Sequence, residues 1–202
     1  MSSDHYFSAS PASADERRTI SVELNGRARK IQTAAGIFSP SGLDKGTEVL
    51  LKYVPTPRGR ILDIGCGWGP ITITAAEQSP ESLVYGVDVN ERSIELARLN
   101  AQNLGLDNVV VGRPESVDPE LEFDTIWSNP PIRIGKEALH ELLLQWLPRL
   151  APGGEAWMVV QKNLGSDSLQ KWLVAQLPGD WSVTREATAK AFRVLKVSRP
   201  AR

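Results

Sequence analysis

Residues 60–70 read RILDIGCGWGP, and this stretch decides the fold. The apolar run that ends at Ile64 is typical of a short buried strand. Pro70 suits the first position of a helix, where its missing N–H costs nothing. The glycines between them let the backbone turn tightly and approach a ligand closely. The stretch therefore predicts a strand, a glycine-rich turn and a helix, which is the ligand-binding unit of doubly wound α/β folds.

Strands and helices alternate outward from this turn. A β-hairpin is expected at 19–33, where Asn25-Gly26 suits a type I′ turn. We expect strands at 60–64, 83–87, 109–111, 123–128, 155–160, 181–187 and 192–198, and helices at 43–53, 70–78, 90–104, 137–150 and 168–177. This order predicts one Rossmann-like, doubly wound sheet that is mostly parallel, with an antiparallel strand at one edge. Residues 1–35 form an extension that begins with a loosely ordered stretch and carries the hairpin, and 36–202 form a single domain.

The composition is ordinary for a globular protein, with 41% hydrophobic and 23% charged residues and a net charge of −1. No apolar run is long enough to span a membrane, and the N-terminus lacks the pattern of a signal peptide. We therefore expect a cytoplasmic protein. A single cysteine and two histidines exclude a disulfide within the chain and disfavour a structural metal site. The oligomeric state cannot be derived from the sequence.

The charges are unevenly distributed along the chain. Lysine and arginine are concentrated in residues 15–30 and 181–202. Such segments are compatible either with a solvated face or with a surface that binds a polyanion. The sequence alone leaves both interpretations open.

The glycine-rich turn favours a cationic cofactor over a dinucleotide. A dinucleotide site needs a glycine where Pro70 stands, and it uses helix N-terminal amides, of which this proline removes one. Asp63, directly before the first glycine, suits the positive charges of S-adenosylmethionine. Asp88 ends the next strand and can accept hydrogen bonds from ribose hydroxyls. The pattern resembles the first motif of class I methyltransferases, which implies a cofactor site at Asp63, Gly65, Cys66, Gly67, Gly69, Asp88 and Val89.

A second motif, Asn129-Pro130-Pro131-Ile132, follows the strand at 123–128 and is expected to lie opposite the glycine turn. An amine on an aromatic ring or a carbonyl is a poor nucleophile because its lone pair is delocalised. Two hydrogen-bond acceptors aimed at its N–H groups would hold it in line with a methyl donor. The side-chain oxygen of Asn129 and the carbonyl of Pro130 can supply them, and Pro131 fixes the turn. The motif predicts methylation of such an amine.

Other nucleophiles and bases are weaker candidates for catalysis. Cys66 lies between two glycines, and no histidine close in sequence could activate it. His5 is in the N-terminal extension, and His140 is expected to pack within a helix. The predicted chemistry needs no strong base, because the proton can leave after methyl transfer.

The second motif resembles the Asn/Asp-Pro-Pro-aromatic motif of amino-group methyltransferases that act on adenine, guanine or glutamine. In that motif the aromatic residue stacks on the target base. Ile132 stands at its position here, and we expect it to sandwich a base less selectively.

Nearly the whole chain resembles the small-subunit rRNA guanine-N2 methyltransferases of the RsmC type. The resemblance rests on HYFS at 5–8, GIFS at 36–39, LDKGT at 43–47, LDIGCG at 62–67 and NPPIRIGK at 129–136. It implies a class I methyltransferase fold, a guanine in rRNA or in a ribosomal subunit as substrate, and a segment from Phe38 to Thr47 that closes over the cofactor. It also implies cofactor contacts by Phe38, Lys45, Thr47 and Asn129, and contacts to RNA phosphate by Arg133 and Lys136.

Two other functions are compatible with these motifs. The best-known members of that family carry two tandem methyltransferase-like domains, and one is expected here, so the acceptor could instead be a protein glutamine or a small amine. The chain could also be an RNA-binding module with a vestigial cofactor site. Intact Asp63, Asp88, Asn129 and the three glycines of the turn argue against such decay.

Overall fold

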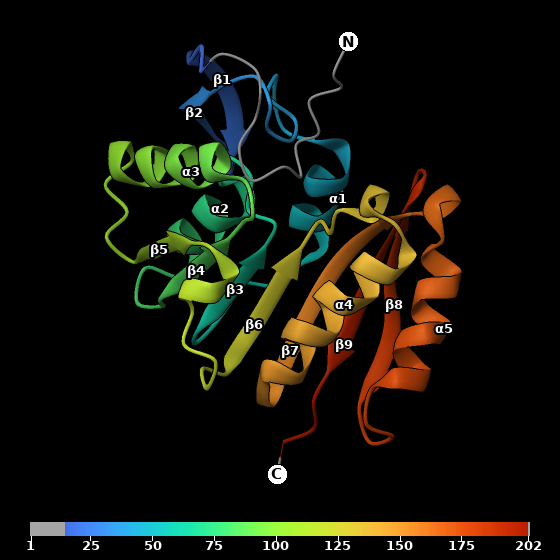
Figure 1. The fold of residues 1–202 in the computed structure, drawn as a ribbon. Coiled ribbons are helices and arrows are strands. Elements are labelled where there is room, and N and C mark those ends of the chain that lie inside the picture. Colours follow the sequence, from blue (N-terminus) through green and yellow to red (C-terminus); the bar gives the residue numbers. More distant parts are fainter. Residues whose placement is uncertain (1–14, 202) are drawn as a thin grey trace.

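A computed structural model describes residues 15–201, so the loosely ordered stretch expected at 1–14 lies outside the described residues. Within the described range, seven strands form one sheet in the order β5-β4-β3-β6-β7-β9-β8 (Figure 1). The strands are β3 (Ile61–Ile64), β4 (Val84–Val87), β5 (Val109–Gly112), β6 (Phe123–Ser128), β7 (Leu150–Gln161), β8 (Ser182–Ala189) and β9 (Phe192–Ser198). Strands β3 to β7 run parallel, and β9 is antiparallel to both of its neighbours. The doubly wound, mostly parallel sheet with an antiparallel edge is confirmed.

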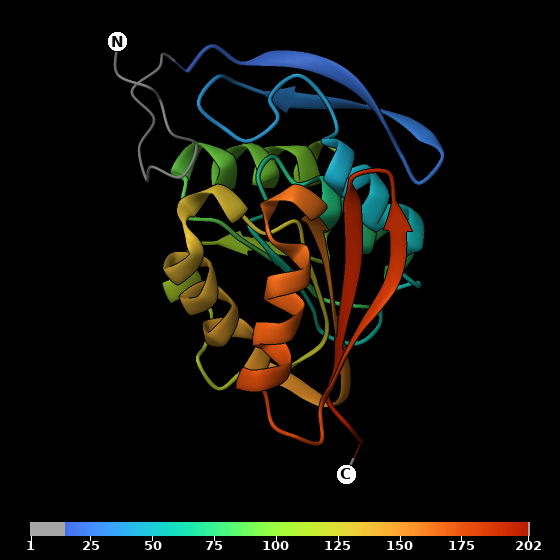
Figure 2. The ribbon, with the colours of Figure 1, turned by 90° about the vertical axis from the view of Figure 1, so that its right-hand side faces the viewer.

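Helices cover both faces of this sheet (Figure 2). One face carries α1 (Lys45–Tyr53), α2 (Pro70–Gln78) and α3 (Glu91–Asn103), and the other carries α4 (Lys136–Trp146) and α5 (Ser166–Gln176). Short 3₁₀ turns are η1 (Pro114–Ser116), η2 (Ile132–Ile134), η3 (Leu147–Arg149) and η4 (Lys162–Leu164). Leu50 and Ile71 fill the core of the first face, and Leu143 and Leu173 fill that of the second. The result is a three-layer α/β/α arrangement.

The chain changes its direction of winding between β3 and β6. From β3 it moves outward through β4 and β5, then returns and moves the other way through β6 and β7. Ile64 and Ser128, the last residues of β3 and β6, are paired in register. The segments that follow these two strands therefore begin side by side, at the switch point where doubly wound sheets bind ligands.

The expected hairpin is confirmed as β1 (Arg18–Leu24) and β2 (Arg27–Thr33), joined at Asn25 and Gly26, whose φ angles are 52° and 70°. Its inner side chains, including Leu24 and Ile31, are buried in one cluster that also holds Trp68 after β3 and Leu96 of α3. The hairpin thus covers the helical layer above α3 (Figures 1 and 2).

The prediction of a helix at 137–150 followed by a turn was wrong: the helix ends earlier, and the predicted turn lies within a strand. Helix α4 ends at Trp146 because Pro148 has no N–H to continue it, and η3 follows. Strand β7 begins at Leu150 and runs through the Pro-Gly-Gly sequence that we expected to be a turn. Gly153, with φ of 76°, donates to the carbonyl oxygens of Arg199 and Pro200, and the pairing of β6 with β7 shifts register there. The sequence Pro-Gly-Gly forms an irregularity inside a strand. No helix among residues 15–201 is long and apolar enough to cross a membrane.

Candidate active site

Four parallel strands end level with one another. Gly112, Val87, Ile64 and Ser128 are successive partners at the ends of β5, β4, β3 and β6. A cavity of about 720 Å³ lies next to these strand ends. A recess of about 20 Å³ lies behind the glycine turn. Both the glycine turn and the Asn-Pro-Pro motif contribute to the cavity wall. The fold therefore brings together two motifs that are far apart in sequence.

Many of the expected site residues lie on these walls. The cavity is lined by Phe38, Gly65, Asp88, Val89, Asn129, Pro130, Pro131, Ile132 and Arg133, and the recess by Thr47, Cys66 and Gly67. Asp63, Gly69 and the exposed Lys45 line neither. Lys136 lies on a shallow groove of about 190 Å³ that adjoins the cavity at Ile132. Among residues 15–201, no cluster of three or more acidic, histidine or cysteine side chains could hold a metal ion.

The three glycines of the turn have different tasks. Gly65, Gly67 and Gly69 have φ angles of 76°, 56° and 100°, which other residues rarely adopt. A Cβ added to Gly67 would meet nothing within 4 Å, and one on Gly65 only Cδ of Pro131 at 4.0 Å. A Cβ on Gly69 would lie 3.4 Å from that of Ala97 on α3. Gly65 and Gly67 therefore keep open space for a ligand, whereas Gly69 allows close packing of α3, and its contact with the cofactor stays a prediction.

Asp88 presents a carboxylate to the cavity. Its Oδ2 accepts from the N–H of Gly67 at 2.9 Å, and its Oδ1 accepts from the N–H of Asn90 at 2.9 Å. Burial raises the pKa of Asp88, and these backbone hydrogen bonds oppose the rise. The backbone N–H of Val89 is a third donor to this carboxylate, which has about four lone-pair positions and so keeps one for a further donor. Asp88 is therefore fixed in place with acceptor capacity left, as a site for a ribose diol requires.

Asp63 lies behind the glycine turn and is completely buried. Its Oδ2 accepts from the hydroxyl of Thr72 at 2.6 Å, and no described residue donates to its Oδ1. Burial raises the pKa of this carboxyl to about 7. Thr72 lies in the first turn of α2, whose N-cap is Gly69 and lacks a side chain to cap it. Asp63 thus supports the start of α2 from the neighbouring strand, and its contact with a cationic cofactor stays a prediction.

Asn129 is oriented by residues at the start of α1. Its Nδ2 donates to Asp44 Oδ2 at 2.9 Å and to Thr47 Oγ1 at 3.0 Å. A carboxylate can only accept, so the amide nitrogen must face Asp44 and the amide oxygen must face elsewhere. Asn129 lines the cavity, and no described residue donates a hydrogen bond to its amide oxygen. Asn129 Oδ1 is therefore left as an acceptor for a ligand.

Asp44 is a site residue that our sequence reasoning missed. It is the N-cap of α1 and accepts from the N–H groups of Gly46 and Thr47 at 2.7 and 3.2 Å. An aspartate directly before a helix is a recognisable capping signal. Its contact with Asn129 crosses 85 positions of sequence, which only the fold reveals.

The two prolines form a tight turn. Pro131 has φ −74° and ψ 76°, and the N–H of Ile132 donates to the carbonyl of Pro130 at 2.8 Å. This geometry is an inverse γ-turn. The Pro130 carbonyl oxygen retains a second lone pair, which can accept from a substrate amine. That contact stays a prediction.

Phe192 of β9 supplies an aromatic side chain near Asn129 that the sequence did not reveal. It lines the cavity, and its ring lies 3.2 Å from the position of a Cβ built on Gly46. The amide nitrogen of Asn129 lies 3.3 Å from the same point. The ring and the amide therefore both flank Gly46 at the start of α1. Trp68, in contrast, packs under the hairpin, and His140 stacks on Trp172 with 3.5 Å between ring centres, as a packing residue.

Comparisons with known proteins agree with this architecture. The family described as methyltransferase small domain matches residues 28–196. The uncharacterized protein YbxB of Bacillus subtilis is 34% identical over 82% of this chain and 85% of its own length. Ribosomal RNA small subunit methyltransferase C of Shewanella loihica is 32% identical over 68% of this chain, which spans 42% of that protein.

Solved structures share the fold. The T. thermophilus 16S rRNA N2 G1207 methyltransferase (RsmC), in complex with AdoMet and guanosine, has a TM-score of 0.75 and is 22% identical. The match covers 94% of this chain and 52% of that chain. At that identity it supports the class I methyltransferase fold alone. With the family match and the glycine turn, it follows that the chain belongs to the methyltransferase small domain family and is an S-adenosylmethionine-dependent methyltransferase.

Proposed function

We propose that the protein methylates the exocyclic amine, N2, of a guanine in ribosomal RNA. The observation that carries this proposal is the orientation of Asn129, whose amide oxygen is left as an acceptor on the cavity wall. The related rRNA methyltransferases, one of them solved with bound guanosine, support the choice of acceptor. An rRNA substrate also supports a cytoplasmic location.

The chain's residues fit S-adenosylmethionine. Gly65 and Gly67 leave a cradle that side chains would fill, and Asp88 has acceptor capacity for the ribose hydroxyls. We assign the wall contributed by Phe38 and Val89 to the same cofactor. When bound, the cofactor supplies a methyl group activated by a sulfonium.

The reacting amine needs positioning more than it needs a base. The N2 lone pair of guanine is delocalised into the ring, and hydrogen bonds from both N–H groups favour the pyramidal nitrogen of the transition state. Asn129 Oδ1 and the carbonyl of Pro130 would accept them. The methylated nitrogen is strongly acidic and loses its extra proton to water.

Unpaired cations near the cavity support an RNA substrate. Arg133, Lys136, Lys162 and Lys190 form no ion pair with any residue between 15 and 201. Lys162 in η4 and the turn at Lys190 are adjacent, because the N–H of Lys162 donates to the carbonyl of Ala191. Of the ten described cations in the two basic segments, which include Lys190, five are paired, namely Arg17, Arg29, Arg185, Lys196 and Arg199. We assign the four unpaired cations to RNA phosphates.

The acceptor class is tested with labelled cofactor and three substrates offered in parallel: protein-free rRNA, small ribosomal subunits, and a cell protein extract freed of nucleic acid. We expect label in rRNA, either free or within subunits. Label that enters protein and not RNA would support the glutamine reading and contradict the proposal. The absence of cofactor binding in calorimetry would support the vestigial reading.

A further inference from the structure

The loop at residues 34–44, between β2 and α1, forms one wall of the cavity. Its contributions to that wall are Ile37, Phe38, Ser39, Pro40 and Asp44. The loop has no regular secondary structure over residues 34–40. A loop of this kind normally has many backbone conformations, and ordering it upon ligand binding lowers affinity.

The hairpin and the glycine turn hold the C-terminal half of this loop. The hydroxyl of Thr33 and the guanidinium of Arg18 both donate to the carbonyl of Pro40 at 3.0 Å. The indole Nε1 of Trp68 donates to the carbonyl of Ser39 at 3.2 Å. These donors come from β1, β2 and the cofactor turn itself, so the loop is connected to both.

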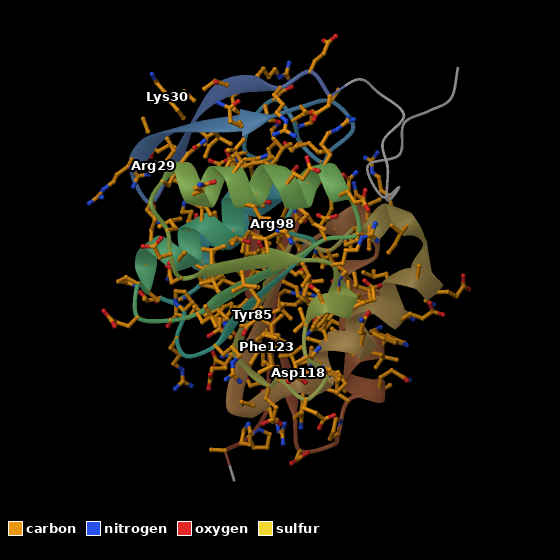
Figure 3. All side chains as sticks on the ribbon, turned by 60° about the vertical axis from the view of Figure 1, so that its left-hand side comes forward. Arg29, Lys30, Tyr85, Arg98, Asp118 and Phe123 are labelled. Carbon is orange, nitrogen blue, oxygen red and sulfur yellow. The ribbon has the colours of Figure 1, made fainter. Side chains whose placement is uncertain are left out.

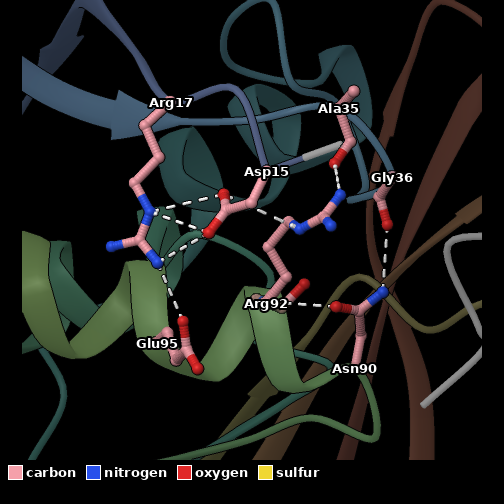
Figure 4. Close-up of polar contacts among 8 residues, drawn as sticks. Asp15, Arg17, Ala35, Gly36, Asn90, Arg92 and Glu95 are labelled. Atoms are coloured by element: carbon pink, nitrogen blue, oxygen red, sulfur yellow. Dashed lines mark hydrogen bonds and ion pairs between the residues drawn. The ribbon is translucent and has the colours of Figure 1, made fainter. Parts of the chain in front are cut away.

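Helix α3 holds the N-terminal half. Arg92 donates to the carbonyl of Ala35 at 2.7 Å, and the amide of Asn90 donates to that of Gly36 at 3.0 Å (Figure 4). The side chain of Arg92 is only 10% exposed, and its guanidinium also lies 3.8 Å from the carboxylate of Asp15. Asp15 in turn pairs with Arg17 at 2.9 Å. Because the side chain of Asp15 is 42% exposed, these solvated ion pairs are expected to contribute little.

The same short segment carries the ribose carboxylate. Asn90 donates its backbone N–H to Asp88 Oδ1 at 2.9 Å and its side-chain amide to the loop. Arg92 follows within the first turn of α3. The placement of Asp88 and the placement of the loop therefore depend on one structural unit.

We propose that Asn90 and Arg92 are positioning residues, which hold the 34–44 loop in its cofactor-binding conformation before S-adenosylmethionine arrives. The loop is then ordered during folding, so its ordering does not weaken cofactor binding. The hairpin that supplies Arg18 and Thr33 becomes part of the cofactor site. The division of the chain at residue 35 stays a prediction, and it would cut through this set of hydrogen bonds.

The test compares Arg92→Gln with Arg98→Gln in the full chain. Arg98 is a matched control on the same helix, since its Nε donates to the carbonyl of Val111 in β5 at 2.8 Å, away from the loop (Figure 3). We expect Arg92→Gln to raise the Kd for S-adenosylmethionine at least tenfold in calorimetry and to speed cofactor release in stopped-flow experiments. Arg98→Gln should change the Kd no more than twofold. With both substrates saturating, kcat of Arg92→Gln should stay near that of the wild type.

Thermal unfolding without cofactor separates positioning from loss of stability. If both variants lose the same Tm and the same affinity, or if Arg92→Gln binds as the wild type does, the proposal is overturned. If Arg92→Gln does not fold, Arg18→Ala serves instead, because Arg18 is exposed and donates to Pro40 and Ser41 of the loop. A wild-type Kd for that variant would then contradict the proposal. Cofactor binding needs no RNA, so these results do not depend on the acceptor we propose.

Discussion

The orientation of Asn129 depends on Asp44, a side chain 85 positions earlier in the sequence. The motif around Asn129 could be read from the sequence because its residues are contiguous. The side chain that orients it could not, since hydrogen bonds across 85 positions leave no local pattern. The same holds for Phe192, whose place in the cavity follows from the pairing of β9 with β7.

Asp44→Asn tests this orientation. Asparagine still caps α1, but it can present an NH₂ group to Asn129 and allow that amide to turn over. We expect kcat to fall by up to about 100-fold, as for a misplaced reacting group, while the Kd for cofactor changes little. Steady-state kinetics and calorimetry measure the two quantities. A kcat equal to that of the wild type would show that Asp44 does not orient Asn129.

Asp63 predicts a pH dependence of stability. Burial raises its pKa to about 7 in the folded protein, whereas the pKa of aspartate in an unfolded chain is about 4. Between these values the folded chain holds a proton that the unfolded chain has released, so the free energy of unfolding falls as pH rises from about 4 to 7. Asp63→Asn can still accept from Thr72 and removes the titration. Denaturant unfolding at pH 5 and pH 8 should show a smaller difference for the variant, and an equal difference would contradict this assignment.

At the scale of elements, the spacing of apolar residues and the positions of turn-forming residues in the sequence were sufficient to predict most strands and helices. The hairpin turn at Asn25-Gly26 and the strand-turn-helix from Ile61 to Gln78 follow from local chemistry. The segment 147–154 did not, because we continued the helix through Pro148, which ends it, and expected a turn at Gly153, which lies inside β7. The outcome at Gly153 depends on its hydrogen bonds to the C-terminal residues Arg199 and Pro200, a non-local contact.

The glycine turn offers a prediction about one element. Gly67 and Gly105 have φ angles of 56° and 68°, and neither has an atom within 4 Å of an added Cβ. Alanine at either position should therefore cost a similar free energy of unfolding, about 1–2 kcal/mol, because of the left-handed backbone. Only Gly67→Ala should also weaken cofactor binding, since Gly105 lies outside the cavity. Equal cofactor affinities for the two variants would contradict the cradle assigned to Gly67.

At the scale of the whole molecule, the switch point between β3 and β6 unites a cofactor half and an acceptor half. Sequence reasoning placed both halves because each motif follows a strand in a doubly wound sheet. It could not decide between a solvated and an RNA-binding role for the basic segments. The structure shows that five of the ten described cations in those segments are paired. Outside those segments, Arg133 and Lys162 form no ion pair with any described residue and lie on segments beside the cavity.

RNA binding by these cations predicts a salt dependence. Each phosphate contact contributes a slope of about −0.7 to a plot of log K against log salt for single-stranded RNA. Lys162→Gln should therefore make the slope shallower by about 0.7. Lys171→Gln is the matched control, because Lys171 is exposed on α5, unpaired, and away from the cavity. Identical slopes for both variants in fluorescence anisotropy would remove Lys162 from the RNA surface.

The most direct test of the central claim is nucleoside analysis of rRNA after reaction with the wild type and with Asn129→Ala. The variant should bind S-adenosylmethionine with nearly wild-type affinity, because we assign the free amide oxygen of Asn129 to the acceptor. We predict that mass spectrometry finds N2-methylguanosine after reaction with the wild type and at least about 100-fold less after reaction with the variant. A methylated nucleoside other than N2-methylguanosine, or equal yields from the two proteins, would contradict the account.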